Sequence, residues 1–420
     1  MAQGSRKTRQ LLVLGAAVLA AAVVALVVVG VVLPLTSTEK PPAAAAPEAR
    51  ERAATASEMD AAAARATQAL RAHDAGAWAA ALPASGRARR SATALFEHVA
   101  RLPWTTVRIV AEPVDGYPGR FFLGAVGELA GADPPDRIMA RRVYDAVARA
   151  GRPVLRADVT PRDIRGQQIM AFRAPVVVRR NGLVVIADKA EQSAAEELAR
   201  AGGPARGRLK LLGLTSRKPV VVYYYASRAE MRRSLGEDPG EERVRFFSHP
   251  PIHLEKTPTW TRDVGVLGPA LAGKEAWTPQ MLAHELTHAY TTSWFVDEKH
   301  APTLLAEGLA TAVEGGRSFQ PLRDDLAAAT SRFPLEKALR AKSLWKGNAI
   351  GKVRLAYLEG ASLVLYVLDH WNLRHLKAFV RAVGDSDLTR KGLEAAARDS
   401  LGVRWHALRA GWTSFVQTLP

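Results

Sequence analysis

The chain has 420 residues, 48% of them hydrophobic and 24% charged, which is typical of a globular protein long enough for two domains and excludes a disordered chain. It contains no cysteine, so disulfides and cysteine ligands are excluded, and any metal must be held by His, Asp or Glu. The net charge of +17 would suit nucleic acid, but the arginines are scattered and no nucleic-acid-binding motif accompanies them, so nucleic acid is not an expected partner.

One long apolar segment, Leu11 to Leu35, dominates the N-terminal region. As a helix it would span about 37 Å, enough to cross a bilayer core about 30 Å thick. Arg6, Lys7 and Arg9 precede it, so the positive-inside rule predicts that residues 1–10 form a cytoplasmic tail and that the remainder is extracytoplasmic. A cleaved signal peptide is the alternative, but its apolar core is only about 7–15 residues long. An uncleaved signal-anchor in the cell membrane is therefore favoured.

The next two regions are a linker and a small domain. Residues 36–55 are rich in proline, alanine and charge, which predicts a flexible linker. Residues 56–188 begin with alanine-rich helical segments and continue with the predicted strands Val107–Val110 and Phe121–Val126. An Asn-Gly pair within 174–188 predicts a tight hairpin. Helices followed by strands in this order resemble the α+β cone of NTF2-like domains, which implies an accessory domain over 56–188.

Residues 189–420 carry strand signals first and helical signals afterwards, an order typical of an α+β domain. Pro219–Tyr225 is predicted as a buried strand, and Val264–Leu271 as an extended segment. From Thr278 onward nearly the whole sequence is predicted to be helical. Because peptides often bind by pairing with a sheet edge, Val264–Leu271 is also a candidate edge strand for substrate.

The helix predicted to start at Thr278-Pro279 carries the sequence MLAHELTHAY. His284 and His288 lie four positions apart, on one helix face, where two imidazoles can bind one zinc ion at about 2.0–2.1 Å. Glu285 follows His284 directly and would lie beside the metal, able to accept a proton from a zinc-bound water. The alternative is an ordinary solvated helix face without metal.

Catalytic zinc generally takes three protein ligands and keeps one open position, so a third ligand is expected elsewhere. The candidate is Glu307 in PTLLAEGLATAVEGG, on a second helix predicted from Pro302 to Gly315-Gly316. The intervening segment, 289–306, leaves room for the first helix to end and the second to pack back against it.

Together, HELTH and the later LAEGLA resemble the gluzincin metallopeptidases, in particular the peptidase MA-like group. The third ligand of that group sits in a W-L-x-E-G-x-A context; Leu305, Glu307, Gly308 and Ala310 match it, whereas Leu304 replaces the tryptophan. The resemblance implies a thermolysin-like α+β domain over 189–420 that binds one Zn²⁺ per chain. It further implies Glu285 as general base and three ligands: His284, His288 and Glu307.

Other zinc peptidase classes fit less well. A metzincin needs glycine and histidine where this chain has Thr291 and Trp294. A gluzincin aminopeptidase would carry a Gly-x-Met-Glu-Asn segment upstream, and the sequence has none. An endopeptidase is therefore favoured.

Further residues are candidate helpers of the site. Glu314 lies almost two turns after Glu307 and could hydrogen-bond a ligand histidine, although a solvated helix-end glutamate is an equal alternative. Thr311, one turn after Glu307, is a weaker candidate. Tyr357 occupies the place where peptidase MA-like sequences often carry a tyrosine, and could donate to the oxyanion; a core tyrosine is the alternative. Other conceivable donors, each more typical of a surface, are His300, His370 and His375.

The sequence therefore predicts a single-pass, membrane-anchored zinc metallopeptidase that acts on a peptide or protein substrate outside the cytoplasm. Two other functions are compatible with the sequence. One is a non-catalytic zinc-binding envelope protein, a pseudo-peptidase that binds a partner or lipid. The other is a scaffold that binds anionic lipid or polyanions through its positive charge.

Overall fold

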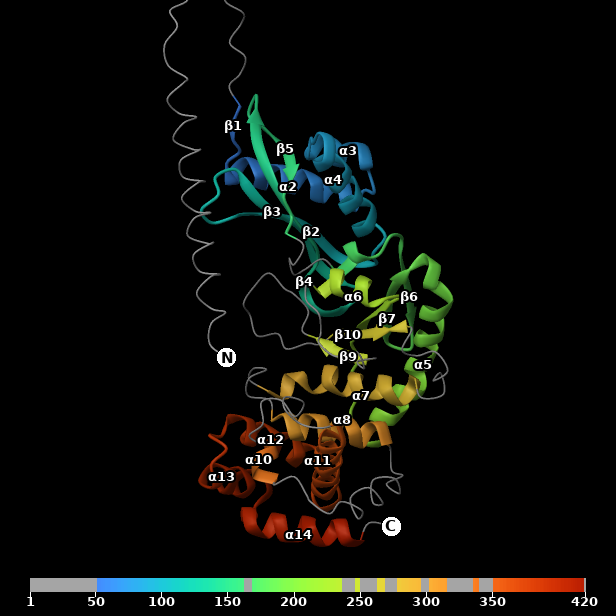
Figure 1. Cartoon of the computed structure of the whole chain (residues 1–420), viewed down its shortest axis with the longest axis vertical. Helices are drawn as coiled ribbons and strands as arrows, with labels where there is room; N and C mark the ends of the chain where they lie inside the picture. Colours follow the sequence, from blue (N-terminus) through green and yellow to red (C-terminus); the bar gives the residue numbers. More distant parts are fainter. Residues whose placement is uncertain are drawn as a thin grey trace, which may run out of the picture. The chain divides into compact units, whose positions relative to one another are not determined.

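The computed structural model describes the chain in eight ranges: 51–161, 168–235, 246–249, 263–268, 278–295, 302–315, 335–339 and 350–418 (Figure 1). The predicted tail, signal-anchor and most of the linker lie outside these ranges, as does His300. Within the described ranges, no helix combines the length and apolar character needed to cross a membrane.

The first part, 51–161, packs helices against an antiparallel sheet. The helices are α2 (Ala56–Arg71), α3 (Ala75–Ala81) and α4 (Gly86–Val99), and the strands are β1 (Arg52–Ala53), β2 (Trp104–Pro113), β3 (Arg120–Leu129), β4 (Ala132–Arg149) and β5 (Arg152–Asp158). Among the described strands the order is β1-β4-β3-β2, with β5 also paired to β4. Thr55 and Glu58 form a capping box that starts α2. The predicted strands at 107–110 and 121–126 fall within β2 and β3.

A second, mixed sheet contains β6 (Pro175–Arg180), β7 (Leu183–Asp188), β8 (Val220–Tyr225), β9 (Phe246–His249) and β10 (Asp263–Leu267). In the described part of the chain these strands are ordered β6-β7-β8-β10-β9. Strands β7, β8 and β10 run parallel, and α5 (Gln192–Leu211) makes the crossover between β7 and β8. Asn181 and Gly182, with φ of 52° and 73°, make the tight turn between β6 and β7, so the predicted hairpin is confirmed.

Two sequence expectations about this sheet are corrected by its pairing. The sequence predicts the hairpin as part of the accessory domain ending at residue 188, but β7 pairs in parallel with β8, so β6 and β7 belong to the second sheet. The described part of the proposed edge strand, 264–268, lies largely in β10, which has β8 on one side and, over residues 263–266, β9 on the other. Over residues 263–266 a substrate strand therefore has no open edge on β10.

Side chains alternate between the two faces of the second sheet, and each face lies in a different core. One face packs with the first part of the chain, through Val184, Ile186, Val221, Tyr223, Tyr225 and Leu267. The other face packs with the helices of the C-terminal half, through Val185, Val222, Tyr224, Val264 and Val266. The region predicted as an accessory domain therefore covers one face of the central sheet and shares a core with it.

A buried ion pair also joins the two sheets. Arg137 of β4 and Asp263, the first residue of β10, form a hydrogen-bonded salt bridge, and their side chains are 2% and 1% exposed. Burial lowers the pKa of Arg137, but the interactions with Asp263 and Tyr223 together outweigh burial and raise that pKa above its ordinary value.

Helices make up the remaining described segments, as predicted from Thr278 onward. They are α6 (Arg228–Leu235), α7 (Thr278–Thr291), α8 (Thr303–Gly315), α10 (Leu335–Leu339), α11 (Ile350–His370), α12 (Leu373–Asp385), α13 (Arg390–Leu401) and α14 (Trp405–Thr418). Helix α7 packs on α5 and α8, and α8 packs in turn on α11 (Figure 1). The fold is thus a mixed α+β arrangement in which α7, α8 and α11 lie together.

Candidate metal centre

Helix α7 presents its two histidines on one side and its apolar residues on the other. Leu282 and Leu286 are fully buried in the core formed with the second sheet. This packing turns His284 and His288 toward α8, where their side chains are only 13% and 10% exposed. The i, i+4 spacing therefore produces a pair of largely buried imidazoles that face the next helix.

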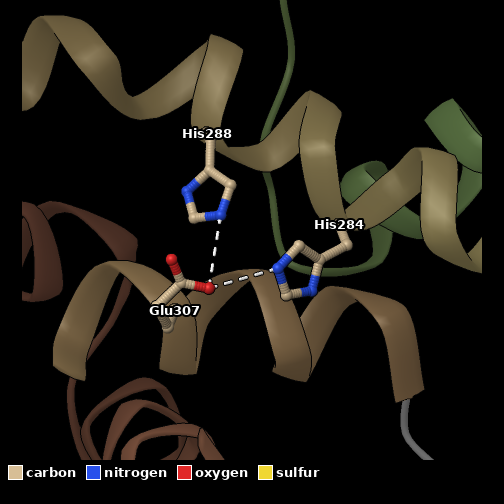
Figure 2. Close-up of side chains that lie close together, drawn as sticks. All are labelled: His284, His288 and Glu307. Carbon is tan, nitrogen blue, oxygen red and sulfur yellow. Dashed lines mark hydrogen bonds and ion pairs between the residues drawn. The ribbon is translucent and has the colours of Figure 1, made fainter. Parts of the chain in front are cut away.

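Helix α8 supplies a carboxylate to both imidazoles (Figure 2). The Nε2 atom of His284 lies 3.3 Å from Glu307 Oε2, and the Nε2 atom of His288 lies 3.5 Å from the same oxygen. Ligands placed about 2.0–2.1 Å from one tetrahedral zinc ion are themselves roughly 3.3–3.4 Å apart. The two separations therefore match the edges of a tetrahedral zinc site as well as they match hydrogen bonds.

The three donor atoms are mutually close. All of them lie within 4.8 Å of one another, and among the described residues this is the single group of three His, Asp or Glu side chains that could hold a metal ion. Two histidines and a carboxylate suit catalytic zinc, and the same set can also bind Fe(II). The residues present therefore fit a divalent transition metal.

The electrostatics of the cluster favour positive charge. Burial by itself would lower the pKa of His284, but its hydrogen bonds with Glu307 and Glu314 and the charges of the neighbouring carboxylates together outweigh burial and raise that pKa well above the ordinary value of 6.5. Burial would raise the pKa of Glu307, but the charge of His288 and the hydrogen bonds of both histidines hold it far below the ordinary value of 4.5. The site thus keeps a carboxylate ionised in a largely buried place, which is what a cation requires.

Glu314 contacts the other nitrogen of His284. Its Oε2 atom lies 3.1 Å from Nδ1, so an Nδ1–H can donate to this carboxylate. Such an acceptor fixes the tautomer and leaves the lone pair of Nε2 directed at the space shared with Glu307 and His288. Glu314 therefore lies where a carboxylate would orient a metal-binding histidine.

Glu285 and Tyr357 both lie next to His284. Glu285 is 8% exposed, and its charge contributes to the raised pKa of His284. Tyr357, on α11, places its ring 6.3 Å from the His284 ring with an angle of 21° between the planes. Three helices thus converge on this histidine: α7 carries it, α8 provides two carboxylates and α11 provides the tyrosine.

The other candidate helpers, His370, His375 and Thr311, make no described contact with the donor atoms of the candidate metal site. His370 hydrogen-bonds the carbonyl of Tyr366, and His375 bonds Asn372 at the start of α12. Neither is linked to the histidine pair by a contact in the described part of the chain. Thr311, between Glu307 and Glu314 on α8, buries its hydroxyl without a hydrogen bond to any described residue.

Two features of the site were not anticipated from the sequence. Arg208 of α5 donates a hydrogen bond of 2.9 Å to the backbone carbonyl of Glu314. Gly308, directly after Glu307, lies against Gly360 of α11. The glycine of LAEGLA was a signal for close helix packing, whereas nothing in the sequence pointed to Arg208.

A scan of the sequence against protein-family models finds no match, and a search of curated proteins finds no significant match. The assignment of this site therefore rests on its side-chain geometry and on the HELTH motif.

Proposed function

We propose that the protein is a zinc metallopeptidase that hydrolyses peptide bonds, with a gluzincin-type site that holds one Zn²⁺ between α7 and α8. The observation that carries this proposal is the convergence of His284, His288 and Glu307, with both histidine–glutamate separations matching those of zinc ligands and Glu285 buried beside them. The proposed setting is the outer side of the cell membrane, to which the segment 11–35 anchors the chain.

Each residue has a defined part in the proposed reaction. Zinc, when bound, would supply Lewis acidity that activates a water molecule and polarises the substrate carbonyl. Glu285 accepts the proton of the attacking water and passes it to the leaving amine. The hydroxyl of Tyr357 donates a hydrogen bond to the substrate carbonyl oxygen as that oxygen becomes negatively charged. Glu314 holds the ring of His284 in place through Nδ1.

Glu285 is what favours hydrolysis over mere metal storage. A two-histidine, one-carboxylate set needs no further acid to hold zinc. Glu285 is 8% exposed and directly follows His284, so its carboxylate lies beside the site, where a general base for an attacking water is required. Proton transfer from water is the task that its position fits.

The test uses the full-length protein purified in detergent. We expect about one zinc per chain by elemental analysis, with iron measured in the same samples, and hydrolysis of a fluorogenic peptide library that a chelator abolishes and zinc restores. His288→Ala should lose the metal. Glu285→Gln should keep the metal and lose hydrolysis by a factor of about 100 or more.

Two other outcomes of this test would each support one of the alternative functions, the zinc-binding pseudo-peptidase or the scaffold that binds anionic lipid. Zinc retained by the wild type without hydrolysis of any library peptide would support a zinc-binding pseudo-peptidase and reject the enzyme. Absence of zinc together with salt-dependent binding to anionic vesicles would support the scaffold.

A further inference from the structure

The last turn of α5 is connected to the metal centre by two hydrogen bonds. Arg208 donates from a guanidinium nitrogen to the Glu314 backbone carbonyl at 2.9 Å. The carboxylate of the same Glu314 lies 3.1 Å from His284 Nδ1. A continuous path thus runs from α5, through the end of α8, to a candidate ligand on α7.

Helix α5 is itself held firmly on the second sheet. The side chain of Asn181, in the β6–β7 turn, donates to the carbonyls of Ala199 and Arg200. Arg206 donates to the backbone carbonyl of Asn181 at 3.2 Å. Gly202 lies so close to the hairpin that a Cβ there would come within 3.0 Å of a side-chain atom. Arg208 therefore projects from a fixed base.

Glu314 needs such support because it is the penultimate residue of α8. Its backbone carbonyl has no partner within the helix, as is general for the last turn, and a cation satisfies that carbonyl and the negative helix end together. The Glu314 side chain is 39% exposed, so water competes for its carboxylate. Fixing the backbone of Glu314 lowers the entropy that its side chain loses on binding His284.

We propose that Arg208 is a positioning residue of the zinc site, which acts through Glu314 to hold the His284 ring with Nε2 directed at the metal. This inference rests on the zinc centre of the proposed function. Arg208 has no contact with the three donor atoms in the described structure, so its effect on metal binding depends on Glu314.

The experiment measures zinc affinity of the full-length, metal-free protein by competition with a chromophoric chelator. Arg208→Met keeps the packing of the side-chain stem and removes the donor, and it should weaken zinc binding by about tenfold, the lower end of the loss expected when Glu314 itself no longer orients His284. Arg208→Lys restores a donor and a charge, and should recover most of the affinity. Arg200→Ala is the matched control, because the exposed side chain of Arg200, on the same helix, forms a surface ion pair with Glu197.

A double-mutant cycle tests the route through Glu314. Glu314→Ala should weaken zinc binding by itself, and adding Arg208→Met should weaken it no further. Thermal unfolding of each metal-free variant checks that the fold is kept; if Arg208→Met does not fold, the cycle is run with Arg208→Lys, whose partial loss must likewise vanish in the Glu314→Ala background.

Three results would overturn the inference. Arg208→Met could bind zinc as tightly as Arg200→Ala, or the double variant could lose the sum of the two single effects. In either case a wild type that binds zinc and hydrolyses peptides leaves the proposed function intact. A wild type without zinc would overturn the proposed function and this inference together.

Discussion

Gly308 of α8 and Gly360 of α11 lie backbone against backbone. A Cβ atom on Gly308 would come nearer than 3.0 Å to backbone atoms of Gly360, and a Cβ on Gly360 would come equally close to the carbonyl of Leu304. Gly308 follows Glu307 directly, and Gly360 lies one turn after Tyr357. This contact therefore fixes how closely the helix with the carboxylate approaches the helix with the tyrosine.

Gly308→Ala should force α8 and α11 apart. Overpacking of this kind costs about 1–3 kcal/mol of stability, and moving Glu307 away from the histidines should lower zinc affinity by about tenfold. Chemical denaturation and chelator competition measure the two effects. Gly315→Ala is the control, because a Cβ at this other glycine of α8 would meet no atom within 4 Å. Equal zinc affinity in the two variants would contradict the role given to the contact.

The sequence was enough to propose those parts of the site that depend on the spacing of residues within one helix. Helical spacing places His284 and His288 on one face whatever the tertiary structure, and the structure brings Glu307 to both. Arg208 could not be found, because its partner is a backbone carbonyl 106 positions away. A bond to a carbonyl leaves no side-chain pattern in the sequence.

In the same way, the sequence predicts a turn between neighbouring strands but not the pairing of strands that are far apart in the chain. Asn181-Gly182 specifies a turn, but a turn does not specify which sheet the hairpin joins; that depends on parallel pairing with β8 beyond α5. Strand β4 was not predicted because it starts with Ala132-Asp133-Pro134-Pro135-Asp136 and later carries several arginines, a composition that is rare in strands.

Zinc affinity should increase with pH. The metal must displace a proton from His284, whose pKa is raised well above 6.5 in the metal-free protein because Glu307 and Glu314 outweigh the effect of burial. At pH values below that pKa, zinc binding releases one proton from His284, so zinc affinity should rise about tenfold for each unit by which the pH is raised. Calorimetry in buffers of different ionisation enthalpy should therefore detect proton release near pH 7.

The metal-free protein should show the opposite trend. The raised pKa of His284 gives a stabilisation that is complete below about pH 6.5 and is lost as the pH rises through the folded pKa. The lowered pKa of Glu307 gives a stabilisation that is present above about pH 4.5 and is lost toward acid. The shift in Tm caused by zinc should therefore grow from pH 6 to pH 8, and His288→Ala should remove it. A zinc shift that shrinks over this range would contradict the assignment.

Tyr357→Phe tests the proposed hydrogen bond to the developing oxyanion. The ring stays beside His284, so zinc should be retained, while kcat should fall by about 100-fold or more with little change in KM. Tyr366→Phe, on the same helix but packed against Phe415, should leave both constants unchanged. Loss of zinc in Tyr357→Phe, or a change confined to KM, would show that the hydroxyl does not act in the chemical step.

Breaking the Arg137–Asp263 pair should be strongly destabilising, because both side chains are almost fully buried where the two sheets meet. Asp263→Asn leaves the Arg137 guanidinium charged without its counter-charge and should cost about 3–5 kcal/mol in chemical denaturation. The exposed pair Arg398–Glu394 is the comparison: Arg398→Ala should cost less than about 0.5 kcal/mol.

A double variant distinguishes the cost of an uncompensated buried charge from the net contribution of the ion pair to stability. Arg137→Met combined with Asp263→Asn removes both charges and so removes the uncompensated one, and should recover at least half of the stability lost in Asp263→Asn. If the double variant is instead less stable than Asp263→Asn, the pair itself is net stabilising and holds the sheets together by attraction. In that case the zinc site should also weaken, because β10 packs against α7 and its first residue is one member of the pair.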